Sequence, residues 1–291
     1  MATTKDEHGN IMAGLMRKAY LEVIPTRTIL DKLVHLPRHS YLSITCSPVN
    51  GLEPTLELVE QLRALPEERQ LKLIPHIAAR LVRDQGHLRE IMARLSDARV
   101  ESIFVPGGDA AEAAGIYPGS LELLRAMAEI GHGIEDIGVA SHPEGHPMLT
   151  NLELLRLLRE KQPFATYMVT QMCFDPMVLV DWLRRVRSEG VTLPAWFGLP
   201  GVAELPKLLS LSMRIGVGQS LQVLKKQKGL VRKLISAKPY QPDDLLAGLQ
   251  PHLGDPALDI RGFHLFSFNN VRRTEDWRAQ TVVRLNGGQH A

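Results

Sequence analysis

Two histidines and a glutamate alternate along one short turn of this sequence. The stretch DIGVASHPEGHP (136–147) runs from apolar residues into His142, Glu144 and His146, with proline or glycine between them. Imidazoles and carboxylates can ligate a metal, or they can line a pocket for an organic ligand. Alternate residues share a side only on an extended backbone, which the prolines and glycine disfavour, and the ligand spacing typical of zinc sites is absent. We therefore expect no metal here, and keep a metal-dependent barrel hydrolase using His76, His142 and His146 as an alternative.

A glutamate inside an apolar run is the second candidate for chemistry. Glu22 lies between Leu21 and Val23 in the run AYLEVIP (19–25). A carboxylate that faces a closed apolar interior is costly unless it is paired or used, so we favour a functional role for Glu22. Further polar residues stand where other β-rich runs end: Thr45, His76, Asp109, His142, Gln171 and Asn269.

Eight β-rich runs position these residues, and amphipathic stretches separate them. The runs are 19–25, 41–46, 71–77, 101–107, 136–141, 166–171, 194–198 and 262–268. Alternating strands and helices predict parallel pairing with right-handed crossovers. Eight such units predict an α/β fold, a single (βα)8 TIM-type barrel with its chemistry at the carboxyl ends of the strands. We place the barrel at 19–285, an N-terminal extension at 1–18 and a flexible C-terminal tail at 286–291.

Composition indicates an ordinary soluble protein. Lys and Arg number 34 against 32 Asp and Glu, so the net charge of +2 gives no argument for nucleic acid or for a membrane surface. Cys46 and Cys173 stand apart, which fits a reducing compartment. The polar start MATTKDEHGN is no signal peptide, and no apolar run is long enough to span a membrane. We expect a cytoplasmic protein that binds neither nucleic acid nor membrane; a homo-oligomer stays open.

Several common motifs are absent, and one helix start is clear. The sequence has no GxSxG elbow, no GxGxxG after a strand and no phosphate-binding GxxxxGK[ST] loop, so a nicotinamide would not sit in a Rossmann domain. TNLE (150–153) is a capping box that opens a helix. Glu153, Arg156 and Arg159 share one face of that helix, and by themselves they indicate a solvated, ion-paired surface. The basic run at 225–233 is likewise expected to be a solvated helix.

Taken in order, the strand ends resemble methylenetetrahydrofolate reductase, a family of flavin-dependent barrel enzymes, from about residue 20 to 275. The resemblance of YLEVIPTRT (20–28) implies that Glu22 is the general acid. That of SITC (43–46) and IPHI (74–77) implies flavin contacts at Thr45 and His76. GGD (107–109) resembles the family's Arg-Gly-Asp, which implies that Asp109 is a second catalytic residue beside the flavin ring, where it would influence the charge on the reduced flavin. IY (116–117) aligns Tyr117 with a flavin-contacting tyrosine.

The second half of the chain continues the resemblance. ASHPEGHP (140–147) resembles the family's Tyr-Pro-Glu-x-His-Pro, which implies that His142 and His146 wall the flavin pocket. VTQMCFD (169–175) makes Gln171 the folate-binding glutamine, and FHLFSFNN (263–270) resembles the last strand, with Asn270 and Arg272 as substrate contacts. The same family resemblance makes Glu153, Arg156 and Arg159 candidate cofactor contacts, although their spacing alone indicates a solvated surface.

Four departures bear on the cofactor. The family's arginine before Gly-Asp is Gly107, and its turn tyrosine is His142. The arginine after the final strand's asparagine is Asn270, with Arg272 or Arg273 as possible substitutes. A helix lysine appears as Glu160, next to Lys161.

The resemblance implies reduction of 5,10-methylenetetrahydrofolate to 5-methyltetrahydrofolate by NADH or NADPH through bound FAD, with tetrahydrofolate and nicotinamide dinucleotide as the binding partners. A flavin-independent, NADH-dependent reductase is the first alternative, since Gly107 and His142 depart from the flavin site. A non-catalytic folate-binding module is the weakest alternative.

Overall fold

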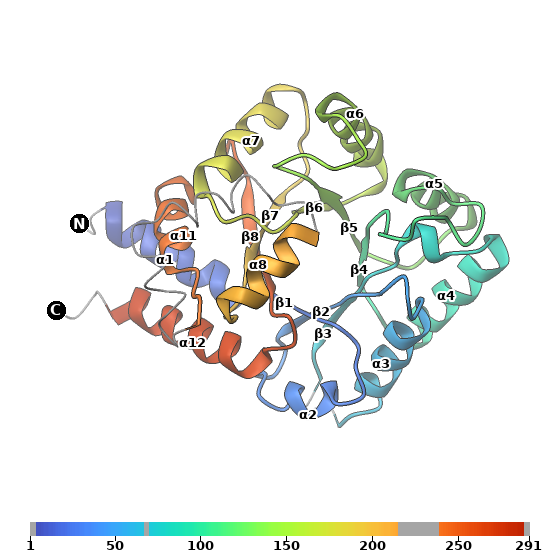
Figure 1. The fold of residues 1–291 in the computed structure, drawn as a ribbon, viewed down its shortest axis with the longest axis horizontal. Coiled ribbons are helices and arrows are strands. Elements are labelled where there is room, and N and C mark those ends of the chain that lie inside the picture. The colour runs from blue at the N-terminus through green and yellow to red at the C-terminus, as the bar shows by residue number, and fades with distance from the viewer. Residues whose placement is uncertain (1–3, 67–69, 215–238, 288–291) are drawn as a thin grey trace.

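Eight parallel strands surround the centre of the molecule, and helices cover them on the outside (Figure 1). The computed structural model describes residues 4–66, 70–214 and 239–287. The strands follow the order β3-β2-β1-β8-β7-β6-β5-β4, so that β3 and β4 are the two ends of the sheet. The expected (βα)8 barrel is confirmed. The basic run at 225–233 and residues 288–291 of the expected tail lie outside the described residues.

The strands alternate with helices along the chain. The strands are β1 (Tyr20–Val23), β2 (Tyr41–Ile44), β3 (Lys72–Pro75), β4 (Ser102–Val105), β5 (Asp136–Ser141), β6 (Tyr167–Thr170), β7 (Ala195–Pro200) and β8 (Ile260–Phe266). The longer helices are α1 (Thr4–Arg17), α3 (Glu53–Arg63), α4 (Gln85–Asp97), α5 (Ser120–Ile130), α6 (Asn151–Lys161), α7 (Pro176–Ser188), α8 (Leu205–Arg214) and α12 (Val271–Gly287). Two shorter ones are α2 (Ile29–Leu33) and α11 (Asp243–Leu249).

Most strands are shorter than the apolar runs that predicted them, and two are displaced. β7 continues to Pro200, although its run was expected to end at 198, and β8 covers 260–266 where 262–268 was expected. The displacement of β8 has a physical cause, because Phe268 and Asn269 adopt positive φ angles of 51° and 61° and so form a turn.

Side chains alternate between two cores. Leu21 and Val23 of β1 point outward into the large core between strands and helices. Tyr20 belongs to a separate aromatic cluster inside the barrel, where its ring stacks on Trp196 at 5.7 Å. This filled base leaves the other end of the barrel, at the carboxyl ends of the strands, for polar groups.

The barrel closes between β3 and β4 mainly at its carboxyl end. His76 bridges to Phe104, and the amide of Ile77 donates to the carbonyl of Phe104 at 2.8 Å. Just past the two strands, the amides of Ala79 and Arg80 donate to the carbonyls of Pro106 and Gly107, each at 3.0 Å. The seam is therefore tied at the end of the barrel where chemistry is expected.

Helix α1 packs beside α12, so the first and last parts of the chain that the structure describes lie on the same side of the molecule (Figure 1). Met12 and Met16 of α1 are buried, and the Arg278 guanidinium of α12 donates to the carbonyls of Met16 and Arg17, each at 3.0 Å. The segment expected to be an N-terminal extension thus covers one side of the barrel. Among the described residues, no helix has the length and apolar character needed to cross a membrane.

Candidate active site

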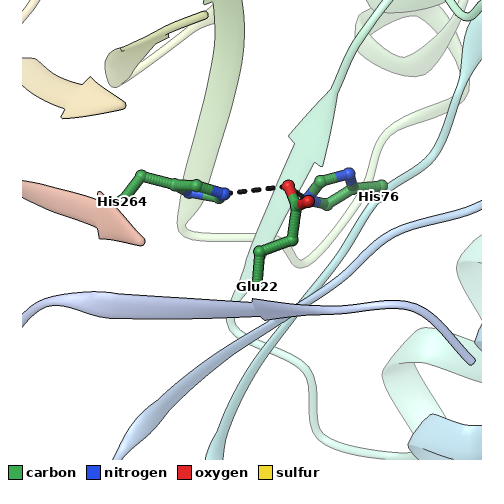
Figure 2. Close-up of side chains that lie close together, drawn as sticks. All are labelled: Glu22, His76 and His264. Carbon is green, nitrogen blue, oxygen red and sulfur yellow. Dashed lines mark hydrogen bonds and ion pairs between the residues drawn. The ribbon is translucent and has the colours of Figure 1, made fainter. Parts of the chain in front are cut away.

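Two side chains from neighbouring strands meet inside the mouth of the barrel. The register of β1 and β8 pairs Tyr20 with His264 and Glu22 with Phe266, which turns all four side chains to the same face. The side chains of Glu22 and His264 meet across that face, and Oε2 of Glu22 lies 3.0 Å from Nε2 of His264 (Figure 2). The side chain of Glu22 is only 16% exposed and that of His264 is 2% exposed, so the contact is screened from water.

A second histidine flanks the same carboxylate. His76 follows β3, and its Nε2 lies 3.9 Å from Oε2 of Glu22 on the side opposite His264 (Figure 2). The same nitrogen is 2.6 Å from the hydroxyl of Ser43 on β2. Burial lowers the pKa of His76 to about 4, with Glu22 opposing the shift and His264 adding to it. His76 is therefore a neutral imidazole at pH 7.

The turn after β8 fixes the backbone around Glu22. The hydroxyl of Ser267 donates to the carbonyl of Glu22. The side chain of Asn269 makes two hydrogen bonds to Ile24: its Oδ1 accepts from the amide and its Nδ2 donates to the carbonyl, each at 2.8 Å. The turn after β8 thus holds the end of β1. Asn269, which the sequence marked only as a polar residue at the end of a β-rich run, has a structural role here.

Sequence reasoning missed His264. Its signal was present, because a histidine inside the apolar run GFHLFSF (262–268) is the same kind of exception as Glu22 inside its own run. Aromatic rings pack around the imidazole, with the Phe266 and Phe104 centroids at 5.0 and 6.4 Å. His264 Nδ1 is buried and has no hydrogen-bond partner among the described residues.

Thr45 and Gln171 lie at the carboxyl ends of their strands, as expected. Both are half-buried. Thr45 follows β2, and its amide donates to the carbonyl of Val23 at 2.9 Å. Gln171 follows β6, and its Oε1 accepts a hydrogen bond from the backbone amide of Met172 at 2.9 Å. The Nε2 amide group is therefore the part of the side chain suited to a ligand.

The loop after β4 carries Asp109, which is exposed, and Gly107, where an added Cβ would meet nothing within 4 Å. Arg80 holds this loop, since its guanidinium donates to the carbonyls of Ala110 (2.8 Å), Ala111 (2.7 Å) and Pro118 (3.1 Å). Tyr117 lies elsewhere: it is buried in the large outer core, and burial raises the pKa of its phenol.

The turn with two histidines forms its own cluster after β5. The rings of His142 and His146 lie 5.1 Å apart, and His146 Nδ1 accepts from the amide of Met148 at 3.2 Å. Burial lowers the pKa of His142 to about 3, and His146 and Lys161 add to the shift. Lys161 is itself buried, donates to the carbonyl of Ala140 at 3.3 Å, and has its pKa lowered to about 8 by burial. In the family resemblance, Glu160 takes the place of the helix lysine, and Lys161 is the next residue. The structure shows that Lys161 is a buried cation beside the carboxyl end of β5.

Helix α6 begins with the predicted capping box, in which the side chains and amides of Thr150 and Glu153 bond reciprocally. Glu153 is exposed and engaged in that cap. Arg156 pairs with Glu160 at 2.8 Å, and Arg159 is exposed. These three candidate cofactor contacts lie on an exposed, partly ion-paired face, as the local pattern indicated.

The two candidate substrate residues after β8 lie at the start of α12. Asn270 Nδ2 donates to the carbonyl of Val202 at 2.8 Å. Arg272 is exposed and lies 3.9 Å from the Asp276 carboxylate. Neither of these contacts involves the Glu22 cluster.

Metal ligation would have to use a different set of residues from the one the turn suggested. Among the described residues, the group close enough to share a metal consists of Glu22, His76 and His264, whose ligand atoms lie within 4.8 Å of one another. It contains His76 but neither His142 nor His146. The histidine set of the hydrolase alternative is therefore not brought together.

The family model described as methylenetetrahydrofolate reductase matches residues 26–225, more than half of the chain. The chain belongs to the methylenetetrahydrofolate reductase family. A relative, methylenetetrahydrofolate reductase 2 of Saccharomyces cerevisiae (strain ATCC 204508 / S288c), is 31% identical over 87 residues, which is 28% of this chain. The matched segment spans only 14% of the length of the yeast protein.

The match to the methylenetetrahydrofolate reductase family covers only part of the site. His76 and Gln171 lie within the matched residues 26–225. Glu22 lies before them and His264 after them, so the roles of these two residues depend on the geometry of the mouth and on the motifs of the outer strands.

Proposed function

We propose that this chain reduces 5,10-methylenetetrahydrofolate to 5-methyltetrahydrofolate with NADH or NADPH. The observation that carries the proposal is the screened carboxylate of Glu22, paired at 3.0 Å with His264 in the mouth of a barrel from this family. Opening the five-membered ring of the substrate requires a proton at nitrogen, and a glutamic acid held out of bulk water is suited to supply it.

Other residues of the mouth have supporting parts in this proposal. The Nε2 amide group of Gln171 donates to the amide-like edge of the pterin. His76 is neutral at pH 7, so it adds no positive charge beside Glu22. The aromatic base of the barrel excludes water beneath the carboxylate. In this proposal the protein binds the pterin, positions the carboxyl group of Glu22 and excludes water from the reacting edge of the substrate.

The residues fit a flavin only in part. Thr45 and His76 are the residues that the family resemblance assigns to the flavin, and the ammonium of Lys161 would be the cation available for a phosphate. Gly107, however, stands in open space where the family resemblance implies a guanidinium. Arg156 is already paired with Glu160. FAD, when bound, would relay the hydride between nicotinamide and folate.

The open space at Gly107 favours a second candidate, a reductase that passes hydride directly from NADH to folate without flavin. The absorbance spectrum of the purified protein separates the two. A flavin spectrum that is bleached by NADH supports the first candidate, and turnover by colourless protein supports the second.

The test of the proposed activity is formation of 5-methyltetrahydrofolate, followed by mass spectrometry, from 5,10-methylenetetrahydrofolate with NADH or NADPH. Full activity after dialysis against a chelator would exclude the metal-dependent hydrolase and any need for the Glu22, His76 and His264 group to hold a metal. Folate binding with no product would instead support a non-catalytic binding module and refute the proposal.

Glu22→Gln is the first predicted variant. It keeps the size and polarity of the side chain but removes the transferable proton, so folate reduction should slow by about 10²–10⁴-fold. Binding of NADH, measured by the change in its fluorescence, should be unchanged because it needs no acid at the folate nitrogen. Folate reduction at near the wild-type rate in Glu22→Gln would remove the acid from the mechanism.

A further inference from the structure

The contact between His264 and Glu22 is directional. Nε2 of His264 lies 3.0 Å from Oε2 of Glu22, whereas His76 approaches the same oxygen only to 3.9 Å. Nε2 of His76 is already engaged by Ser43 at 2.6 Å. Oε2 is thus the oxygen that both histidines face, and His264 is its hydrogen-bonding partner.

The unpartnered nitrogen of His264 indicates where the ring carries its proton. A neutral imidazole has one N–H and one lone pair. If the proton were on Nδ1, a buried N–H would be left without an acceptor, since aromatic rings pack around it and no partner is present among the described residues. Buried N–H groups without an acceptor are rarer than acceptors without a donor. The Nε2–H form, which donates to Glu22 Oε2, is therefore favoured.

Donation from Nε2–H has a consequence for the acid. An oxygen that accepts this hydrogen bond does not point a proton of its own at the same histidine. The proton of a neutral Glu22 then sits on Oε1. In the opposite arrangement Oε2–H would donate to His264, and the proton would point away from a substrate.

We propose that His264 is a positioning residue which, by donating to Oε2 of Glu22, keeps the transferable proton on Oε1. This inference rests on the proposed function, in which Glu22 is the general acid. His264 does not touch the substrate in this proposal; it acts only through the carboxyl group.

The test compares substitutions that differ in the donor alone. His264→Leu removes the donor, and the single-turnover rate of folate reduction should fall roughly 10- to 100-fold, as expected when a reacting group is misplaced. The dissociation constants for folate and NADH should change little. His264→Gln offers an amide N–H at a similar reach and should recover most of the lost rate.

A double variant gives the sharpest readout. If His264 acts only through the proton of Glu22, then adding His264→Leu to Glu22→Gln should produce no further loss. Phe104→Leu serves as the matched control, because it loosens the packing around the same imidazole without removing a hydrogen bond. Its rate should stay within about 3-fold of wild type, in line with an effect on packing rather than on the reacting group.

Distinct outcomes separate this inference from the activity on which it rests. Wild-type protein that forms no methyltetrahydrofolate overturns the proposed function. With active wild type and inactive Glu22→Gln, the inference about His264 is overturned by any of four results. These are a wild-type rate in His264→Leu, no recovery in His264→Gln, a further loss when His264→Leu is added to Glu22→Gln, or a loss in Phe104→Leu equal to that in His264→Leu.

Discussion

At the scale of single residues, the site depends on one histidine, His76, that burial keeps neutral at pH 7. His76 is 5% exposed, and it is flanked by the carboxylate of Glu22 and the imidazole of His264. Its pKa, lowered by burial from 6.5 to about 4, links the protonation of the mouth to the stability of the fold. In the unfolded chain His76 takes up a proton at a higher pH than in the folded protein.

This difference predicts how stability depends on pH. Above pH 6.5 His76 is neutral in the folded and the unfolded protein, and its contribution to the free energy of unfolding is complete. As the pH falls from 6.5 to 4, the unfolded protein gains the proton first, and up to about 3 kcal/mol of stability is lost. His76→Gln, which cannot be protonated, should flatten the pH dependence of urea unfolding in that window. His132→Gln, at an exposed histidine, is the control and should leave the slope as it is. An unchanged slope in His76→Gln would contradict the burial effect.

The sequence reveals a functional residue well where a charged or polar side chain stands inside an apolar run. Glu22 was recognisable because a carboxylate inside an apolar strand needs a reason, and the capping box of Thr150 and Glu153 because its signal is local. His264 was overlooked even though it offers the same kind of exception. Its partner is 242 positions away in the chain, and only the register of β1 and β8 brings the two together.

At the scale of elements, the ends of β1 and β8 are joined through side chains of the turn that follows β8. Asn269 bonds both backbone groups of Ile24 while adopting a φ of 61°. Asparagine suits both requirements, because it tolerates the left-handed region and can mimic a backbone amide.

Two substitutions at Asn269 separate these requirements. Asn269→Gly keeps the backbone conformation and loses the two hydrogen bonds, so unfolding free energy should fall by about 1–3 kcal/mol. Asn269→Ala should cost about 1 kcal/mol more, because alanine disfavours a positive φ. Urea unfolding measures both, and folate reduction should slow in both because Glu22 lies two residues before Ile24. Equal stability of wild type and Asn269→Gly would mean that the turn does not hold β1.

Element boundaries were harder to derive from the sequence than element order. The alternation of apolar runs and amphipathic stretches was enough for the order, since each run had to be covered by a helix. The end of β8 was misplaced because an apolar run does not reveal that Phe268 already adopts a positive φ. The three flavin contacts assigned to α6 were inferred from the resemblance, whereas the local spacing alone indicated the ion-paired face.

At the scale of the whole molecule, residues that precede the barrel are part of its support. Met16 of α1 is 0% exposed, and α1 packs against α12 near the other end of the chain. Met16→Ala should lower the unfolding free energy by about 2–5 kcal/mol, because it leaves a cavity in a packed core. Met148→Ala, at a methionine that is 81% exposed, should change it by less than about 0.5 kcal/mol. Similar melting temperatures for the two variants would show that α1 adds no packing energy.

The seam between β3 and β4 has a mechanical consequence. Its hydrogen bonds from Ile77, Ala79 and Arg80 gather at the mouth, and Arg80 adds the clamp on the following loop. Thermal widening of the barrel should then be concentrated toward the base of this seam, where the ladder between the two strands lacks backbone bonds among the described residues. We expect the rim to stay stiffer than the base of this seam, so that a proton donor at the rim holds its position better than a group at the opposite end of the barrel would.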